Sequence, residues 1–407
     1  MTRLDIPSTT PPAPTRGTSR RTFLVAGGVA AALAAAAGFG GQYLQDRRVS
    51  GTGKQLSGSA PAVTIGGPGV EQKPFPPGAE ITGIPGLSPF YTPNNQFYRV
   101  DTALVVPKVS VQSWQLRIHG MVDRPMTLSF QDLIDRPMLD QDITLTCVSD
   151  SVGGTRIGNA RWQGTLLASV LREAGIQPGA TQIVMRDRMG MNLGVATAPV
   201  MDGRDSLLAI GMNGQALPPE HGFPVRVVVP GLYGYVSACK WVVDMELTTF
   251  GAFDAYYTKL GWAAQAPIKT ESRIDTPKDG GQPTSGEVVM IAGGAWAQHR
   301  GIEAVEVGVD GTWHQATLAA QDVLDSWRQW YYPWRATAGQ HTLQVRATDK
   351  SGHTQTSAVH HTAPNGATGY HTIHVTVALY RSPGNRRARL SAAMSAFLVW
   401  PGCEPRA

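Results

Sequence analysis

The feature that most constrains this chain is the run of residues 142–150, which alternates apolar and polar side chains and then presents one thiol. Ile143 and Leu145 share one face and two threonines share the other. The run therefore predicts a half-buried strand that delivers Cys147 to the loop that follows. A thiolate there suits a soft transition-metal site, whereas an isolated Cys is more often a small core residue. Cys147 alone leaves both interpretations open.

Two longer motifs follow Cys147. The first is IGNARWQG at residues 157–164, after the glycines of the loop, and the second is HGFPVRVVVPG at residues 221–231. Together with the Cys they resemble the sulfite oxidase family of molybdopterin enzymes. The resemblance covers residues 90 to 378, with the motifs in the family's order. It implies molybdenum-molybdopterin (Mo-molybdopterin) as the cofactor, with Cys147 as the metal ligand.

The resemblance also implies a fold of the α+β class. We expect a sulfite-oxidase-type mixed α/β molybdopterin-binding domain, followed by an immunoglobulin-like β-sandwich domain. The expected parts are a twin-arginine signal or membrane anchor at residues 1–48, a Gly/Pro/Ser-rich linker at 49–92, the molybdopterin-binding catalytic domain at 93–266, the immunoglobulin-like dimerisation domain at 267–378 and a disordered tail at 379–407.

The charge of the chain argues against a nucleic-acid partner. The formal net charge is +5. Residues 1–48 hold six Arg and two Asp, for +4, and residues 379–407 hold five Arg and one Glu, for another +4, so the rest carries 5 − 8 = −3. Nucleic-acid binding needs clustered cations on the folded surface, and this body is mildly acidic. We therefore expect no nucleic-acid partner.

The N-terminal segment predicts export. Arg20 and Arg21 precede an apolar, Ala/Gly-rich run, a pattern typical of the twin-arginine signal that carries folded proteins. The run at residues 23–41 is close to the ~20 residues that a bilayer requires, so a plain membrane anchor is the alternative, and both can hold. We expect a protein that is anchored in the cell membrane or is otherwise extracytoplasmic, as in a periplasm.

Local patterns predict several elements. Ser129 and Asp132 indicate the capped start of a helix that ends before Pro137, and apolar residues at helical spacing predict a second helix from Thr165 to Gly175. After residue 267, short alternating runs bounded by Gly predict a β-sandwich, with a hairpin at Asp310-Gly311. In the related enzymes such a domain forms a homodimer.

The resemblance assigns candidate cofactor ligands as well. In the related enzymes, groups at matching positions hold the anionic tail of the pterin. Arg suits that task because its planar guanidinium matches the oxygens of a phosphate. The alternative is that Arg226 and Lys240 only flank apolar strands and point into solvent. The candidate cofactor-binding residues are Phe97, Tyr98, Arg99, Cys147, His221, Arg226, Ser237 and Lys240. Cys239 matches no family role and is expected to be a core thiol.

Arg99 and Arg161 are the candidates for substrate contact, because the family surrounds its metal centre with guanidinium groups that bind an oxyanion. Together with Cys147 they form the predicted catalytic set. Sulfite oxidases have an Asn and further arginines just after the metal-binding Cys, whereas this chain has Ser-Asp-Ser at residues 149–151. Asp150 would oppose a sulfite dianion unless it is paired with Arg156 or another cation.

The chain offers no sign of zinc or covalent haem. Eight of its ten His follow residue 298, but the spacing of His371 and His374 on one strand turns them to opposite faces. No paired Cys or Cys-x-x-Cys-His pattern is present. Electrons must therefore pass to a separate partner, either a cytochrome or a quinone-linked protein.

These observations predict an exported molybdenum-dependent oxidoreductase that transfers an oxygen atom, with sulfite as the first choice of substrate. A reductase of S-oxides or N-oxides is the alternative enzyme. A hypothesis from another class is a cofactor-free surface binding module built on the sandwich.

Overall fold

The computed structural model describes residues 73–103 and 105–379. The predicted export signal, most of the predicted linker and nearly all of the predicted tail lie outside these ranges. None of the helices within them is long and apolar enough to cross a membrane.

The described chain is mostly β, with short helices, of which the longest has eight residues. Helices are thus fewer than the expected α+β class implies. The strands are β1 (Gln115–Gly120), β2 (Met126–Ser129), β3 (Leu139–Thr146), β4 (Ile157–Leu166), β5 (Gln182–Asp187), β6 (Asn192–Ala196), β7 (Leu207–Met212), β8 (Gln215–Ala216), β9 (Arg226–Val228), β10 (Val242–Thr248), β11 (Glu271–Thr276), β12 (Val288–Trp296), β13 (Ile302–Val309), β14 (Thr312–Gln315), β15 (Thr317–Leu318), β16 (Arg328–Arg335), β17 (Gly339–Asp349) and β18 (His371–Val377). The helices are α2 (Phe130–Ile134), α3 (Leu167–Ala174), α4 (Thr197–Met201), η1 (Pro219–His221), α5 (Gly234–Ser237) and α6 (Tyr256–Lys259).

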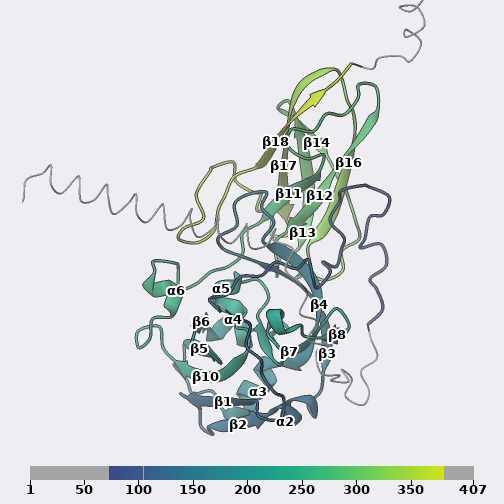
Figure 1. Ribbon diagram of the computed structural model, residues 1–407. Helices are drawn as coiled ribbons and strands as arrows, with labels where there is room; N and C mark the ends of the chain where they lie inside the picture. The colour runs from purple at the N-terminus through teal and green to yellow at the C-terminus, as the bar shows by residue number, and fades with distance from the viewer. Residues whose placement is uncertain (1–72, 104, 380–407) are drawn as a thin grey trace, which may run out of the picture. The chain divides into compact units, whose positions relative to one another are not determined.

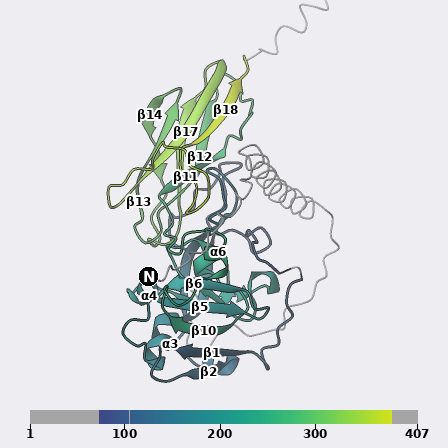
Figure 2. The same ribbon diagram turned by 90° about the vertical axis from the view of Figure 1, so that its left-hand side faces the viewer.

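Two sheets build the first half of the described chain. One has the order β2-β1-β10-β5-β6, and its strands run side by side in Figure 2. The other has the order β3-β4-β7-β8, with β9 paired to β7. β1 and β10 are parallel although more than a hundred residues separate them, so this sheet closes through a long crossover. The second sheet carries β3, which leads to Cys147, and β9, which begins with Arg226.

Both predicted helices are confirmed. α2 begins with a capping box, in which the Ser129 side chain accepts from the Asp132 N–H and the Asp132 side chain accepts from the Ser129 N–H. α3 covers the predicted span and ends at Gly175, whose φ of 70° lies in the left-handed region. α3 buries its apolar face in the main core between the sheets.

The second half is a sandwich of two four-stranded sheets, β11-β12-β16-β15 and β14-β13-β17-β18, drawn green to yellow in Figure 1. Their inward residues form one apolar core that includes Trp330 and Trp334. The predicted hairpin is confirmed, because β13 and β14 pair across Asp310 and Gly311 at φ 50° and 84°. Positive φ at both positions is what a type I′ turn requires.

β3 departs from the half-buried strand that the alternation predicts. Both of its faces are covered near its end, since Thr144 and Thr146 are as inaccessible as Ile143 and Leu145, at 2% exposure or less. The covering groups on the threonine side include Trp327, which is far away in the sequence. An alternating pattern shows which face is more apolar, but it does not show whether another domain covers the polar face.

The described part of the predicted linker packs closely against the rest of the chain. Phe90 is fully buried, and its carbonyl accepts from Trp327 Nε1 at 2.9 Å. Gln329 bonds to this segment twice, to the Ile81 N–H and to the Ser88 carbonyl, both at 2.6 Å. The segment therefore joins the sandwich to the first half of the chain, although it has no regular secondary structure of its own.

Candidate active site

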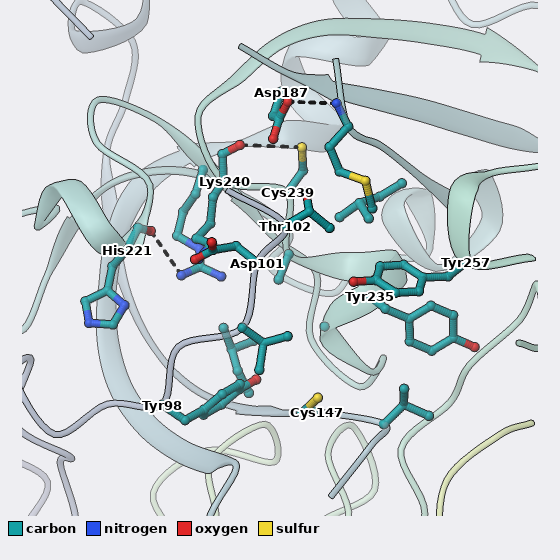
Figure 3. A pocket seen from close by; sticks show the side chains of 18 of the residues that line it. Tyr98, Asp101, Thr102, Cys147, Asp187, His221, Tyr235, Cys239, Lys240 and Tyr257 are labelled. Atoms are coloured by element: carbon teal, nitrogen blue, oxygen red, sulfur yellow. Dashed lines mark hydrogen bonds and ion pairs between the residues drawn. The ribbon is translucent and has the colours of Figure 1, made fainter. Parts of the chain in front are cut away.

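One cavity, of about 140 Å³, brings together most of the predicted site residues. Figure 3 shows Cys147 on one side of it and His221, Asp101 and Lys240 on the other, with the rings of Tyr98, Tyr235 and Tyr257 around the space between. Phe97 and Arg226 also line it. The cavity thus combines a thiol, a group of cations and an aromatic wall.

Cys147 follows the last residue of β3 and is held by its backbone. Its N–H donates to the Arg156 carbonyl at 2.9 Å, and its Sγ lies 3.0 Å from the Ser149 hydroxyl. Burial raises the pKa of the thiol, although the hydrogen bonds to Ser149 and the charge of Arg156 oppose that effect. A soft metal ion would take this sulfur as the thiolate and displace its proton.

Arg226 is a buried cation with spare hydrogen-bonding capacity. It is 5% exposed, its guanidinium lies 4.8 Å from the centre of the Trp162 ring, and its Nη1 donates to the His221 carbonyl at 3.1 Å. Its Nε has no hydrogen-bond partner within the described ranges. Burial lowers the pKa of Arg226 to about 10. A buried guanidinium with an unused donor indicates a site for an anion.

Lys240 and Arg226 form the cationic end of the cavity, and His221 lies beside them. Lys240 Nζ pairs with the Asp101 carboxylate at 2.5 Å, and burial lowers the pKa of Lys240 to about 8 even though Asp101 opposes the shift. His221 Nε2 lies 2.8 Å from the Asn94 carbonyl, so Nε2 carries the proton and donates. Burial lowers the pKa of His221 to about 4, which leaves a neutral ring at pH 7.

Three predicted residues, Ser237, Arg99 and Arg161, lie outside this cavity lining. Ser237, in α5, donates its hydroxyl to the Leu232 and Tyr233 carbonyls at 2.9 and 3.1 Å, so it holds its own turn together. The Arg99 guanidinium is exposed and pairs with Asp101 at 2.8 Å. Although burial alone would raise the pKa of Asp101, its bonds to Arg99 and Lys240 lower it. Arg99 therefore reaches the cationic end only through Asp101.

Arg161 lies at a different cavity, which Tyr91 and Asp140 also line. It forms a fork with Asp142, with Nε and Nη2 each 3.0 Å from a carboxylate oxygen. It also donates to the Lys73 carbonyl, to the Pro74 carbonyl at 3.1 Å and to the Tyr91 hydroxyl at 2.5 Å. Its donors are used up within the chain, so the structure does not bring Arg161 together with Cys147.

Asp150, the unexpected acid of the loop, is paired. Its Oδ2 accepts from the Arg156 N–H at 2.8 Å, and its Oδ1 lies 3.9 Å from the Arg156 guanidinium. Burial nevertheless raises the pKa of Asp150. The repulsion that this carboxylate would exert on an anion is therefore partly offset.

Sequence reasoning missed several lining residues. Tyr235, Tyr257 and Trp262 lie in stretches without a periodic pattern. Asp101 follows Arg99 closely, and no motif marks it as a residue of the site. The one available signal was the local gathering of aromatic residues at 256–262. Tyr98 and Tyr257 line the same cavity as Cys147, and burial raises the pKa of both hydroxyls. They are donors at any ordinary pH.

The residues present fit a molybdopterin. The thiol of Cys147, which could bind a soft metal, lies at one side of the cavity. The buried guanidinium of Arg226, whose Nε has no partner in the described part of the chain, lies at the other side, where an anionic tail would bind. Gly158 adds a close approach, because a Cβ there would lie 2.7 Å from the Phe97 ring. Cys147, Arg226, His221 and Lys240 would hold the group.

Comparisons with known proteins agree with this fit. The family model described as oxidoreductase molybdopterin binding domain matches residues 103–257. Mitochondrial sulfite oxidase of Macaca fascicularis is 30% identical over 71% of this chain and 62% of its own length. Nitrate reductase [NADH] 1 of Oryza sativa is 29% identical over 38% of this chain and 20% of its own length. The chain thus spans less than two thirds of these relatives.

A solved structure shares the fold. The sulfane dehydrogenase SoxCD from Paracoccus pantotrophus aligns with a TM-score of 0.60 and 21% identity, covering 81% of this chain and 96% of that one. At that identity the likeness concerns the fold alone. The family match, the sulfite oxidase relatives and the shared fold lead to one conclusion: the chain belongs to the sulfite oxidase family of molybdopterin-dependent oxidoreductases, whose cofactor is Mo-molybdopterin.

Proposed function

We propose that this chain reduces a small, neutral S-oxide or N-oxide at the cavity beside Cys147. The observation that carries the proposal is that, in the described part of the chain, carboxylates already engage both arginines predicted to contact the substrate. Arg161 is committed to Asp142, and Arg99 to Asp101. A sulfite dianion would need charge-assisted donors, whereas a neutral oxide needs only hydrogen-bond donors to its oxygen.

The aromatic wall supplies such donors. The hydroxyls of Tyr98 and Tyr257 can bond to an oxide oxygen, and Trp262 can pack on an apolar substituent. When bound, the cofactor supplies two-electron oxygen-atom transfer. The balance is that one S-oxide or N-oxide takes two electrons and two protons, releases water and loses its oxygen. The protein's own residues bind, orient and shield the substrate.

Sulfite oxidation is the second candidate, and the sulfite oxidase relatives favour it. Metal-loaded protein separates the two reactions. We expect oxidation of a reduced viologen dye by S-oxides or N-oxides, and little reduction of an acceptor dye by sulfite. Sulfite-dependent dye reduction without turnover of any oxide would reverse the assignment. Cys147→Ser should abolish the activity, because a hydroxyl is a poor ligand at a soft metal site.

The surroundings of the enzyme are also proposals. The twin arginines and the apolar run at residues 23–41 support export by the twin-arginine route and contact with the cell membrane. A separate electron-transfer partner would supply the electrons. The two-sheet sandwich supports an immunoglobulin-like domain that joins two copies of the chain. Arg20→Lys with Arg21→Lys should leave folded protein in the cytoplasm.

A further inference from the structure

The strand that leads to Cys147 lies at the edge of its sheet. Within the described chain, β3 pairs with β4 on one side only. On the other side, the Thr144 N–H donates to the Asp325 carbonyl at 2.9 Å, and the Thr144 carbonyl accepts from Gln298 Nε2 at 3.0 Å. Asp325 and Gln298 both belong to loops of the sandwich. The sandwich therefore completes the free edge of β3 at one residue.

The side chain of Thr144 makes a second connection. Its hydroxyl accepts from the Trp327 N–H at 2.7 Å and donates to Asn159 Oδ1 at 2.9 Å. Thr144 and Asn159 are inaccessible and Trp327 is 3% exposed, so water cannot replace either bond. Every polar group of Thr144 is thus satisfied, three of the four bonds by sandwich residues.

The loop after Cys147 is held by the sandwich as well. Arg273 of β11 donates from Nη1 to the Gly154 carbonyl at 2.8 Å, while Asp275 holds its Nε at 2.7 Å. At Gly153, with φ 79°, a Cβ would lie 2.1 Å from the ring of His371 of β18. The glycine is therefore needed twice, for its backbone angle and for the close approach of the sandwich.

We propose that the sandwich is a positioning platform for Cys147, which it holds through Thr144 on one side and Gly153-Gly154 on the other. The proposal rests on the proposed function in taking Cys147 as the metal ligand. Cys147 is tied to the anchored loop through two backbone donors, because its N–H donates to the Arg156 carbonyl and the Arg156 N–H donates to Asp150 of that loop. Thr144, Arg273 and His371 are positioning residues, since they act only through the backbone that carries the thiol.

Misplacing a ligand or substrate group by about 1 Å can cost on the order of a hundredfold in rate. Loss of either anchor should therefore lower kcat rather than raise KM, because the substrate wall of tyrosines comes from other segments. It should also change the environment of the bound metal without loss of the fold. A purely architectural contact would alter stability and leave both of these properties unchanged.

The test uses holoenzyme and matched variants. Thr144→Val keeps the shape and removes the hydroxyl, whereas Thr144→Ser keeps the hydroxyl. Arg273→Met removes the loop anchor, and Arg346→Met removes a sandwich arginine that pairs with Glu306 instead. The measurements are molybdenum content, kcat, KM and the electron paramagnetic resonance spectrum of the partly reduced holoenzyme.

We expect Thr144→Val and Arg273→Met to keep their molybdenum and KM, to lose at least tenfold in kcat and to give an altered spectrum. Thr144→Ser and Arg346→Met should match the wild type. Spectra and kcat values equal to wild type in both anchor variants would overturn the proposal, and if Thr144→Val does not fold, Arg273→Met decides. Cys147→Ser separates the two hypotheses: an unchanged spectrum there refutes Cys147 as the ligand, whereas a changed one beside unaltered anchor variants refutes only the platform.

Discussion

Arg226 and Arg161 both stand in motifs of the family, yet their surroundings differ. Arg226 is buried, its Nε has no hydrogen-bond partner among the residues that the structure describes, and it lines the cavity that contains Cys147. Arg161 has its donors saturated by Asp142, two carbonyls and a tyrosine hydroxyl. The comparison teaches that a motif places an arginine, whereas its partners decide whether it is free to bind a ligand. The largest effects should come from replacing each of these two arginines with an uncharged residue.

Arg161→Gln should destabilise the protein by about 3–5 kcal/mol, because Asp142 would remain as a buried carboxylate with a weak partner. The nearest remaining cation, Lys73, lies 3.7 Å from it. Urea unfolding measures the loss, and Arg136→Gln, which breaks an exposed pair with Glu173, should cost at most about 1 kcal/mol. The KM of folded Arg161→Gln should equal that of wild type. A sharply raised KM would restore Arg161 to the substrate site.

Arg226→Met should weaken cofactor retention by roughly 30-fold or more, because losing one charged partner of a buried anion costs about 2–5 kcal/mol. Molybdenum and pterin content after exhaustive dialysis is the measurement. Arg161→Met serves as the matched control, and its folded fraction should keep the cofactor. Equal loss of molybdenum and pterin from Arg226→Met and Arg161→Met would show that Arg226 has no special role in holding the cofactor.

The smallest effect concerns pH at the cationic end. The pKa of Lys240 is lowered to about 8, and a bound phosphate would raise it again because the anion favours the charged amine. Cofactor affinity should thus be flat below about pH 7 and should fall by up to about tenfold per pH unit above pH 8. Cofactor retention after dialysis between pH 6.5 and 9.5 tests this. The affinity of Lys240→Met for the cofactor should not fall above pH 8, and the same pH dependence in the variant and the wild type would contradict the role of Lys240.

Local determinants explain which parts of the fold were predictable. The hairpin at Asp310-Gly311 and the capping box at Ser129 depend on neighbouring residues, and both were found. The burial of Thr144 depends on Trp327, 183 positions away, so no local pattern could indicate it. The α+β class expected from the family resemblance implied more helix than the structure contains. A class name describes the typical helix content of a family, whereas each short helix depends on its own local contacts.

The site follows the same rule. Cys147, His221 and Arg226, which come from the motifs, line one cavity. The partner of Lys240 is Asp101, 139 positions earlier, and it could not be deduced from spacing. The separation of Arg161 from Cys147 has a similar cause. Its carboxylate partner is the residue opposite it on β3, and that register appears only once the strands pair.

The packing of residues 81–92 determines when this segment can fold during synthesis of the chain. Ile81 bonds to Gln329, 248 residues later, and Phe90 bonds to Trp327, 237 residues later. A ribosome that adds ~5–20 residues per second needs roughly 12–50 s to cover the longer distance. Until then residues 81–92, which precede Phe97 and Tyr98, cannot form their hydrogen bonds to Trp327 and Gln329. The contacts that hold this segment are therefore completed only after residues 327 and 329 have been synthesised.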